Sequence, residues 1–326
     1  MTAAPSGPPP APAASFPPLT VVPSPAPARH VRTLAVLGDS TPAGHCDPVP
    51  GGGWRGFAVL LGAALAADTL VNTARTGARM VDVARTQVPA AVASSPDVAV
   101  LVAGMNDTMR SDFDPAALLA HCSEAVRALR AAGAHVVLMR YHDHTRLFRL
   151  PAMLGRALLR RIVALNGVID AVAATDAVGI SVLDLHRLPG GYDPTAWAVD
   201  RLHPSERGHR LLTAGITALL VDAGFAVPQP VSLECAGGRR VTAVHRVAWL
   251  LVKGIPWLVR RGRDLGPTIV QGLLSELRRS PRTEGGPALR RPGGSGSARP
   301  GRWGRPRRGA PRSATAAPAC RSGTAR

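Results

Sequence analysis

The sequence predicts an α/β domain in which five parallel strands form one sheet with helices on both faces. Two observations support this prediction. Short apolar runs alternate with stretches whose apolar residues recur at helical spacing, and polar blocks follow several of the apolar runs directly. Strands that alternate with helices form a parallel sheet covered on both faces. We therefore expect a three-layer α/β/α sandwich whose functional loops lie beyond the carboxyl ends of the strands.

The expected strands are short and mostly apolar. Residues 98–103 read VAVLVA, a continuous apolar run that is typical of a strand buried on both faces. The other strands are expected at residues 33–37, 69–72, 135–139 and 180–185.

The expected helices occupy the segments between these strands, at residues 57–66, 78–93, 154–178 and 204–223. The clearest helix follows Asp114, a natural N-cap, and has Pro115 at its first position. An apolar stripe runs along it, and Gly133 ends it.

The net charge of +18 lies almost wholly in one part of the chain, with Arg29 as the remaining positive charge. Residues 31–235 contain 18 Arg and 18 Asp or Glu, a balance of zero, whereas residues 236–326 contain 20 basic and 3 acidic residues. The domain predicted to carry the chemistry is therefore neutral. A strongly basic chain suggests nucleic acid as a partner. Because residues 31–235 are neutral, that argument does not apply to this domain.

Composition divides the chain into four segments. Residues 1–30 form a Pro- and Ala-rich leader expected to be disordered, 31–235 the α/β domain, 236–283 an amphipathic helical appendage, and 284–326 a disordered basic tail. The leader lacks the basic and apolar regions of a signal peptide, no segment is apolar enough to span a membrane, and the four cysteines have no paired spacing. We therefore expect a cytoplasmic protein.

Residues 241–279 leave three alternatives open. Apolar residues at helical spacing favour an appendage packed on the main domain. The interleaved arginines, with Trp257 and Leu258, also fit a segment that makes peripheral contact with an anionic membrane surface. Nucleic-acid binding is disfavoured because interleaved aromatic residues are sparse.

Four polar blocks mark the expected strand ends and the start of the last helix. They are Gly38-Asp39-Ser40, residues 72–77 ending in Gly77, Gly104-Met105-Asn106-Asp107 and Asp200-Arg201-Leu202-His203-Pro204. Each block alone is as well explained by a turn, a polar loop or a helix cap. Their order and their placement at strand ends make a common site the better explanation.

Together these blocks resemble the four blocks of the SGNH/GDSL hydrolase superfamily, over roughly residues 31–222. The resemblance is greatest to an actinobacterial group of GDSL-like lipases and acylhydrolases, partly through Asp200-Arg201-Leu202-His203. It implies the flavodoxin-like SGNH hydrolase fold. It also implies an oxyanion hole formed by the backbone N–H groups of Ser40 and Gly77 and the side-chain amide of Asn106.

Acyl transfer requires the residue types that these blocks supply. A serine hydroxyl needs a base to become nucleophilic, and imidazole titrates near neutrality. A carboxylate beside the imidazole fixes its tautomer. We therefore expect Ser40 as the nucleophile, His203 as its base and Asp200 as the partner of His203, with no metal and no cofactor. Asp39 and Asp107 are expected to support their loops instead.

Two features depart from the family pattern or compete with this assignment. Thr41 stands where the family name has Leu, and Pro42 removes a backbone donor, so the substrate is less certain than the mechanism. His142-Asp143-His144 could suggest a metal site, but without a further ligand we prefer a solvated or pocket-lining loop.

The substrate expected from the sequence is a small-molecule or lipid ester. A carboxylesterase or lipase-like activity is favoured, because the apolar segment 241–279 could line an acyl pocket or face a membrane. The alternatives are a carbohydrate acetylesterase of the same fold and a non-enzymatic module that binds a membrane surface through its basic C-terminal third. Every position of the triad and of the oxyanion hole is filled, which favours an enzyme.

Overall fold

The computed structural model describes residues 28–147 and 152–235, together with residues 244 and 252. Its centre is a five-stranded, wholly parallel sheet with the strand order β2-β1-β3-β4-β5. The strands are β1 (Thr33–Gly38), β2 (Thr69–Asn72), β3 (Val98–Val102), β4 (His135–Arg140) and β5 (Ile180–Asp184). This order is that of flavodoxin-like folds, and the chain reverses direction across the sheet between β1 and β3.

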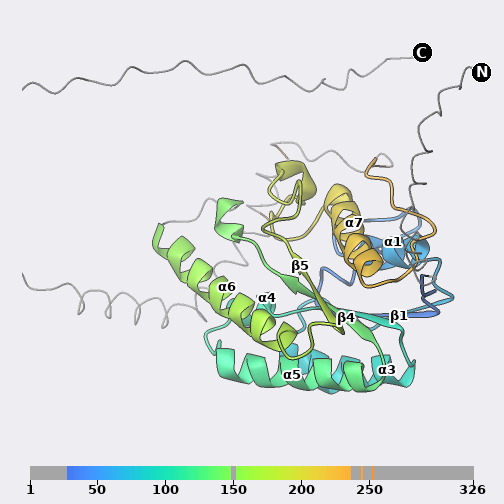
Figure 1. Ribbon diagram of the computed structural model, residues 1–326. Coiled ribbons are helices and arrows are strands. Elements are labelled where there is room, and N and C mark those ends of the chain that lie inside the picture. Colours follow the sequence, from blue (N-terminus) through green and yellow to red (C-terminus); the bar gives the residue numbers. More distant parts are fainter. Residues whose placement is uncertain (1–27, 148–151, 236–243, 245–251, 253–326) are drawn as a thin grey trace, which may run out of the picture. The chain divides into compact units, whose positions relative to one another are not determined.

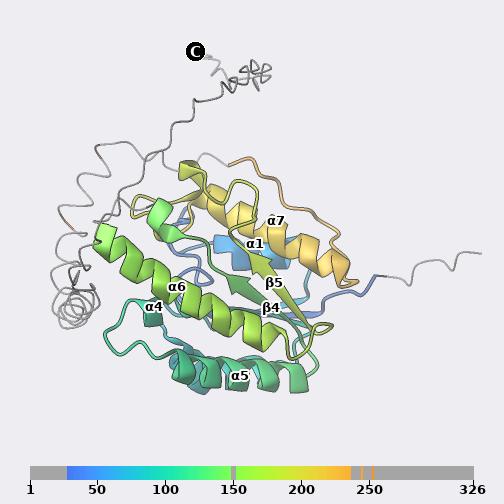
Figure 2. The same cartoon turned by 60° about the vertical axis from the view of Figure 1, so that its left-hand side comes forward.

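Helices cover both faces of the sheet (Figure 1). Helices α1 (Gly56–Ala64) and α7 (Glu206–Asp222) pack together on one face. Helices α3 (Val88–Ala93), α5 (Pro115–Ala131) and α6 (Ala152–Ala173) lie on the other, and the rotated view in Figure 2 shows the same two layers. The three-layer prediction is therefore confirmed.

The local signals in the sequence produce the expected elements. All five residues of β3 are buried, as predicted for a central strand covered on both faces. Asp114 caps α5, since its side chain accepts a hydrogen bond from the N–H of Ala116, and Pro115 is the first helical residue.

The helix expected at 78–93 is interrupted by a π-helical turn. The segment contains α2 (Met80–Asp82), the π turn (Val83–Gln87) and α3. The turn places the buried side chain of Gln87 against the end of β1, where its Oε1 accepts from the Gly38 N–H at 2.7 Å and its Nε2 donates to the Gly38 carbonyl at 3.0 Å. A π turn shifts the helical register by one residue, which apolar periodicity does not reveal.

The start of the last helix differs from the prediction. Pro204 was expected to open it, but α7 begins at Glu206 and is capped by Ser205. Pro204 instead forms an isolated β-bridge with Trp197. The structure also contains a short helix that periodicity did not predict, α4 (Met105–Thr108), directly after β3.

Apart from residues 244 and 252, the predicted appendage at 236–283 lies outside the described residues, as do the tail at 284–326 and most of the leader at 1–30. Of the leader, Arg29 is described and is tied to the domain, since its backbone pairs with Phe225 and its guanidinium lies 4.0 Å from the centre of that ring. Among the helices described, none combines the length and apolar character needed to cross a membrane.

Candidate active site

Ser40 lies two residues beyond the carboxyl end of β1. The strand ends at Gly38, whose φ of +133° is a left-handed value that favours glycine. A Cβ at this position would also clash with the carbonyl oxygen of Val102 on β3. The turn therefore depends on glycine, and it presents a Ser40 side chain that is 8% exposed.

The loop before α7 brings His203 to Ser40. His203 Nε2 lies 2.8 Å from Ser40 Oγ, and His203 Nδ1 lies 2.7 Å from Asp200 Oδ2. The other oxygen of Asp200 accepts the backbone N–H groups of Leu202 and His203 at 2.9 and 3.0 Å. The structure thus joins the three residues predicted for the triad in one hydrogen-bonded chain.

The charge of Asp200 is stabilised within this turn. Burial alone would raise the pKa of Asp200, but the ring and backbone N–H groups of His203 and the N–H of Leu202 lower it below its usual value. An ionised Asp200 holds the proton of His203 on Nδ1, so that Nε2 presents its lone pair to Ser40.

The three groups predicted for the oxyanion hole line the same cavity as Ser40 and His203. Within the described part of the chain, no protein acceptor is bound by the backbone N–H of Ser40 or of Gly77. Gly77 has φ of +83°, and a Cβ there would point into open space. Asn106 Nδ2 donates one hydrogen bond to the Ala78 carbonyl at 3.1 Å, which leaves its second N–H available.

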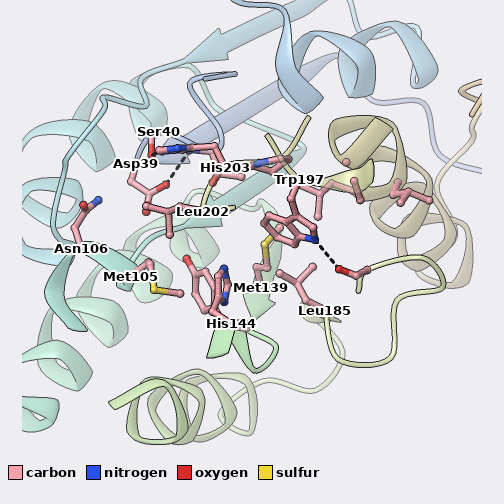
Figure 3. A pocket seen from close by; sticks show the side chains of 18 of the residues that line it. Asp39, Ser40, Met105, Asn106, Met139, His144, Leu185, Trp197, Leu202 and His203 are labelled. Atoms are coloured by element: carbon pink, nitrogen blue, oxygen red, sulfur yellow. Dashed lines mark hydrogen bonds between the residues drawn. The ribbon is translucent and has the colours of Figure 1, made fainter. Parts of the chain in front are cut away.

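The cavity has a volume of about 250 Å³ and runs along the carboxyl ends of the strands. In Figure 3, Ser40 and His203 lie at its upper side, Asn106 at the left, and Met139, His144 and Leu185 on the opposite side. Most of the lining side chains are apolar. They are Met105, Met109, Met139, Leu185, Leu188, Ala196, Trp197, Leu202, Pro204, Leu211 and Leu212.

The two acidic neighbours of the site support loops, as expected. Asp39 Oδ1 accepts the N–H of Thr41 at 3.0 Å and holds the turn at Ser40. Asp107 accepts from the backbone of Met80 and from Arg79 Nε, so it joins the loops that follow β2 and β3. Burial raises the pKa of Asp39 to about 6, against the lowering effects of the Thr41 N–H and His203.

The substitution Asp39→Asn is expected to stabilise the protein above pH 6. Because the folded pKa is about 6 and the usual value is 3.8, the folded chain binds this proton more tightly, and stability falls as pH rises between these values. A pKa difference of this size corresponds to about 3 kcal/mol at most. Urea unfolding at pH 8 should show the gain, and it should shrink towards pH 4. A gain that does not change with pH would contradict the explanation.

Three other histidines are buried and make contacts within the domain. His209 is fully buried, accepts from the Phe57 N–H through Nδ1 at 3.2 Å and lies 3.1 Å from the His45 carbonyl through Nε2. His142 and His144 stack on each other with 4.2 Å between ring centres, and His144 lines the cavity. Burial lowers the pKa of His142 to about 2 and that of His144 to about 4, so both rings are neutral.

Sequence reasoning missed several residues that shape the site. Trp197 lines the cavity, and its Nε1 donates to the Gly191 carbonyl at 2.9 Å. Tyr141 also lines the cavity and directly follows β4. Tyr141 follows the rule that residues just beyond strand ends line the site, whereas Trp197 lies farther along the loop between β5 and α7. Gln87 left no comparable signal, because it lies in the middle of a helical segment.

The sequence was compared with known protein families and with proteins of curated function. The sequence matches the GDSL-like lipase/acylhydrolase family over residues 36–211. No protein of curated function matches it.

Several solved structures are similar to the chain. TesA is 27% identical, with 59% of this chain and 99% of that chain covered and a TM-score of 0.45. The lipase/acylhydrolase of Enterococcus faecalis is 21% identical, with 63% and 100% covered and a TM-score of 0.46. A catalytic mutant of Axe2, an acetylxylan esterase of Geobacillus stearothermophilus, is 18% identical, with 58% and 94% covered and a TM-score of 0.47.

The family match spans more than half of the 326 residues and includes Ser40 and His203. The resemblance inferred from the four blocks is therefore confirmed: this chain belongs to the GDSL-like lipase/acylhydrolase family and is a serine hydrolase of ester bonds.

Proposed function

We propose that this protein hydrolyses carboxylic esters through an acyl-enzyme on Ser40. The observation that carries the proposal is the hydrogen-bonded chain from Ser40 Oγ through the His203 ring to Asp200, with contacts of 2.8 and 2.7 Å. Ser40 is the nucleophile, His203 is the general base, and Asp200 orients His203 and stabilises its charged form.

The reaction proceeds in two acyl transfers. His203 Nε2 takes the proton of Ser40 as Oγ attacks the ester carbonyl, and the negative charge collects on the carbonyl oxygen. The N–H groups of Ser40 and Gly77 and the amide of Asn106 are placed to stabilise that oxyanion. His203 then protonates the departing alcohol. Water, deprotonated by His203, attacks the acyl-enzyme, releases the acid and restores Ser40.

Labelling with a fluorophosphonate tests the nucleophile directly. This reagent forms a stable phosphonyl ester with an activated serine, so peptide mapping by mass spectrometry should find the adduct on Ser40. Labelling should disappear in His203→Gln, which keeps the hydroxyl but removes the base. An adduct on another serine of the chain would overturn the assignment.

The oxyanion role of Asn106 has its own test. Asn106→Ala removes one of three donors, so we expect kcat to fall by about 10²–10³ with little change in KM. Because Asn106 also bonds to Ala78, thermal melting should be recorded beside the kinetics. A decrease in kcat of less than about threefold in a variant that melts like the wild type would remove Asn106 from the mechanism.

The walls of the cavity favour an ester with an apolar acyl chain of limited length. Eleven apolar side chains line it, and its volume of about 250 Å³ is slightly below the usual range for ligand sites. Burial of each added methylene stabilises the bound chain until the cavity is filled. Carbohydrate esters would require more polar groups than this wall offers.

A series of p-nitrophenyl esters tests this preference. We expect kcat/KM to rise from acetate through butyrate to hexanoate and to fall at laurate. Met139→Trp, which fills the side of the cavity opposite Ser40, should lower the hexanoate rate by about tenfold or more and spare the acetate rate. Val163→Trp is the matched control, because Val163 lies on α6 and is 61% exposed. A maximum at acetate in the wild type would favour an acetylesterase instead.

A further inference from the structure

The loop that follows Ser40 folds back over the triad. The His45 N–H donates to the Ser40 carbonyl at 3.0 Å, and the His45 carbonyl lies 3.1 Å from Nε2 of the buried His209. Cys46 has φ of 72°, a left-handed value that is uncommon outside glycine. The loop is therefore fixed at both sides of His45, and it carries His45 and Cys46 towards His203.

The side chains of this loop lie directly against the proposed base. The ring of His45 packs edge-on against the ring of His203 with 4.5 Å between centres, and Trp54 packs on it at 4.9 Å. One ligand atom from each of His45, Cys46 and His203 lies within 4.8 Å of the others. In the described residues this is the one group of three His, Cys, Asp or Glu side chains with such spacing.

We propose that His45, Cys46 and His203 form an inhibitory site for a thiophilic divalent cation such as Zn²⁺. Two imidazole nitrogens and one thiolate sulfur are the donors that zinc prefers, and a fourth position stays open for water. The inhibitory effect rests on the proposed function, whereas binding of the metal does not. The acyl-enzyme mechanism proposed above uses no ion.

The second coordination shell is already in place. Asp200 Oδ2 lies 2.7 Å from His203 Nδ1, so the lone pair of His203 is on Nε2. Histidine ligands of zinc commonly bind a carboxylate through their other nitrogen in this way. The arrangement that prepares His203 to accept a proton from Ser40 therefore also prepares it to bind a metal.

Binding of the metal and activation of Ser40 exclude each other. A cation on Nε2 occupies the lone pair that now faces Ser40 Oγ at 2.8 Å, so the hydroxyl loses its base. Cys46 binds as a thiolate, and its proton passes to solvent as the metal–sulfur bond forms. Bond lengths of about 2.0–2.3 Å bring tetrahedral ligand atoms to about 3.3–3.8 Å from one another, so the side chains must close by about 1 Å.

Cobalt(II) provides a probe of binding that is independent of activity. Untagged full-length protein with Co²⁺ should show a thiolate-to-cobalt charge-transfer band in the near ultraviolet and intense tetrahedral bands in the visible, and Zn²⁺ should displace them. The charge-transfer band should be lost in Cys46→Ser and weakened in His45→Gln. It should remain in Cys235→Ser, the matched control, whose thiol is exposed and outside this group.

Inhibition is measured with p-nitrophenyl butyrate. Zn²⁺ should abolish hydrolysis by the wild type, and EDTA should restore it. Cys46→Ser and His45→Gln should keep their metal-free rates, while the zinc concentration for half-inhibition rises by at least about tenfold, because even loss of a second-shell partner costs 10–100-fold. Equal inhibition of all variants, or a Co²⁺ spectrum without a thiolate band, would overturn the proposal.

One variant separates this site from the proposed function. Ser40→Ala lacks the nucleophile but keeps all three ligands, so it should bind Co²⁺ as the wild type does. A normal cobalt spectrum with hydrolysis that does not depend on Ser40 would refute the proposed function and leave the metal site standing. A Ser40-dependent hydrolysis without cobalt binding would do the reverse.

Discussion

Ser40→Ala is expected to lower kcat for p-nitrophenyl butyrate by about 10⁵–10⁶, with KM nearly unchanged. The variant has no nucleophile, and substrate binding with the oxyanion donors leaves a residual acceleration of about 10³–10⁴ over the reaction in water. Substrate binding should persist because the cavity walls are contributed by other residues.

Ser94→Ala is the matched control for this variant. The Ser94 hydroxyl donates to the Ala91 carbonyl at 2.7 Å at the end of α3 and does not line the cavity. Its loss should leave kcat within about twofold, as for most surface substitutions. Equal rates for Ser40→Ala and the wild type would refute the acyl-enzyme mechanism.

Asp200→Asn is expected to lower kcat by about 10⁴, as loss of the carboxylate does in other serine hydrolases. The asparagine amide can donate to His203 Nδ1, which places the ring proton on Nε2 and removes the lone pair from Ser40. The backbone contacts of Asp200 Oδ1 with Leu202 and His203 can be kept by the amide oxygen. The effect should therefore fall on kcat rather than on folding.

Asp193→Asn is the matched control, because it makes the same change in the same loop. Asp193 Oδ1 accepts the N–H of Thr195 at 2.8 Å and makes no contact with His203. Measurement of kcat, KM and melting temperature for both variants separates positioning of His203 from support of the loop. A similar decrease in kcat for both would show that Asp200 acts only as a loop anchor.

The sequence was sufficient to predict the sheet and, to within about a residue, where its strands begin and end. The strand at 69–72 was predicted to the residue, because turn residues and charges flank a short apolar run. The helix cap at Asp114 was predicted for the same reason, since capping depends on a few neighbouring residues. Local chemistry decides such features, so one sequence is sufficient.

Features decided by distant contacts were not predicted. The π turn at Val83–Gln87 accompanies the contact of the Gln87 amide with both backbone groups of Gly38, which is 49 residues away in the chain. The start of α7 was placed too early, because Pro204 pairs with Trp197 in the preceding loop. Neither contact leaves a pattern of apolar residues.

The candidate site was predictable as a set of residues but not as a geometry. Sequence order at strand ends identified Ser40 and His203, and the family match supports the resemblance behind them. The approach of His45 and Cys46 to His203 was not foreseen. It depends on left-handed backbone at Cys46 and on the contact between His209 and the His45 carbonyl, which only the folded chain reveals.

The two hydrogen bonds of the His203 ring join residues at very different separations in the sequence. Asp200 is three residues away within one turn, whereas Ser40 is 163 residues away and meets His203 only when the loop before α7 is in place beside β1. If the loop before α7 moved partly away from β1, Ser40 would separate from His203 while the hydrogen bond between Asp200 and His203 stayed intact. Heat inactivation should therefore precede loss of helix content, because the Ser40–His203 contact would break at a lower temperature than the one at which the domain unfolds.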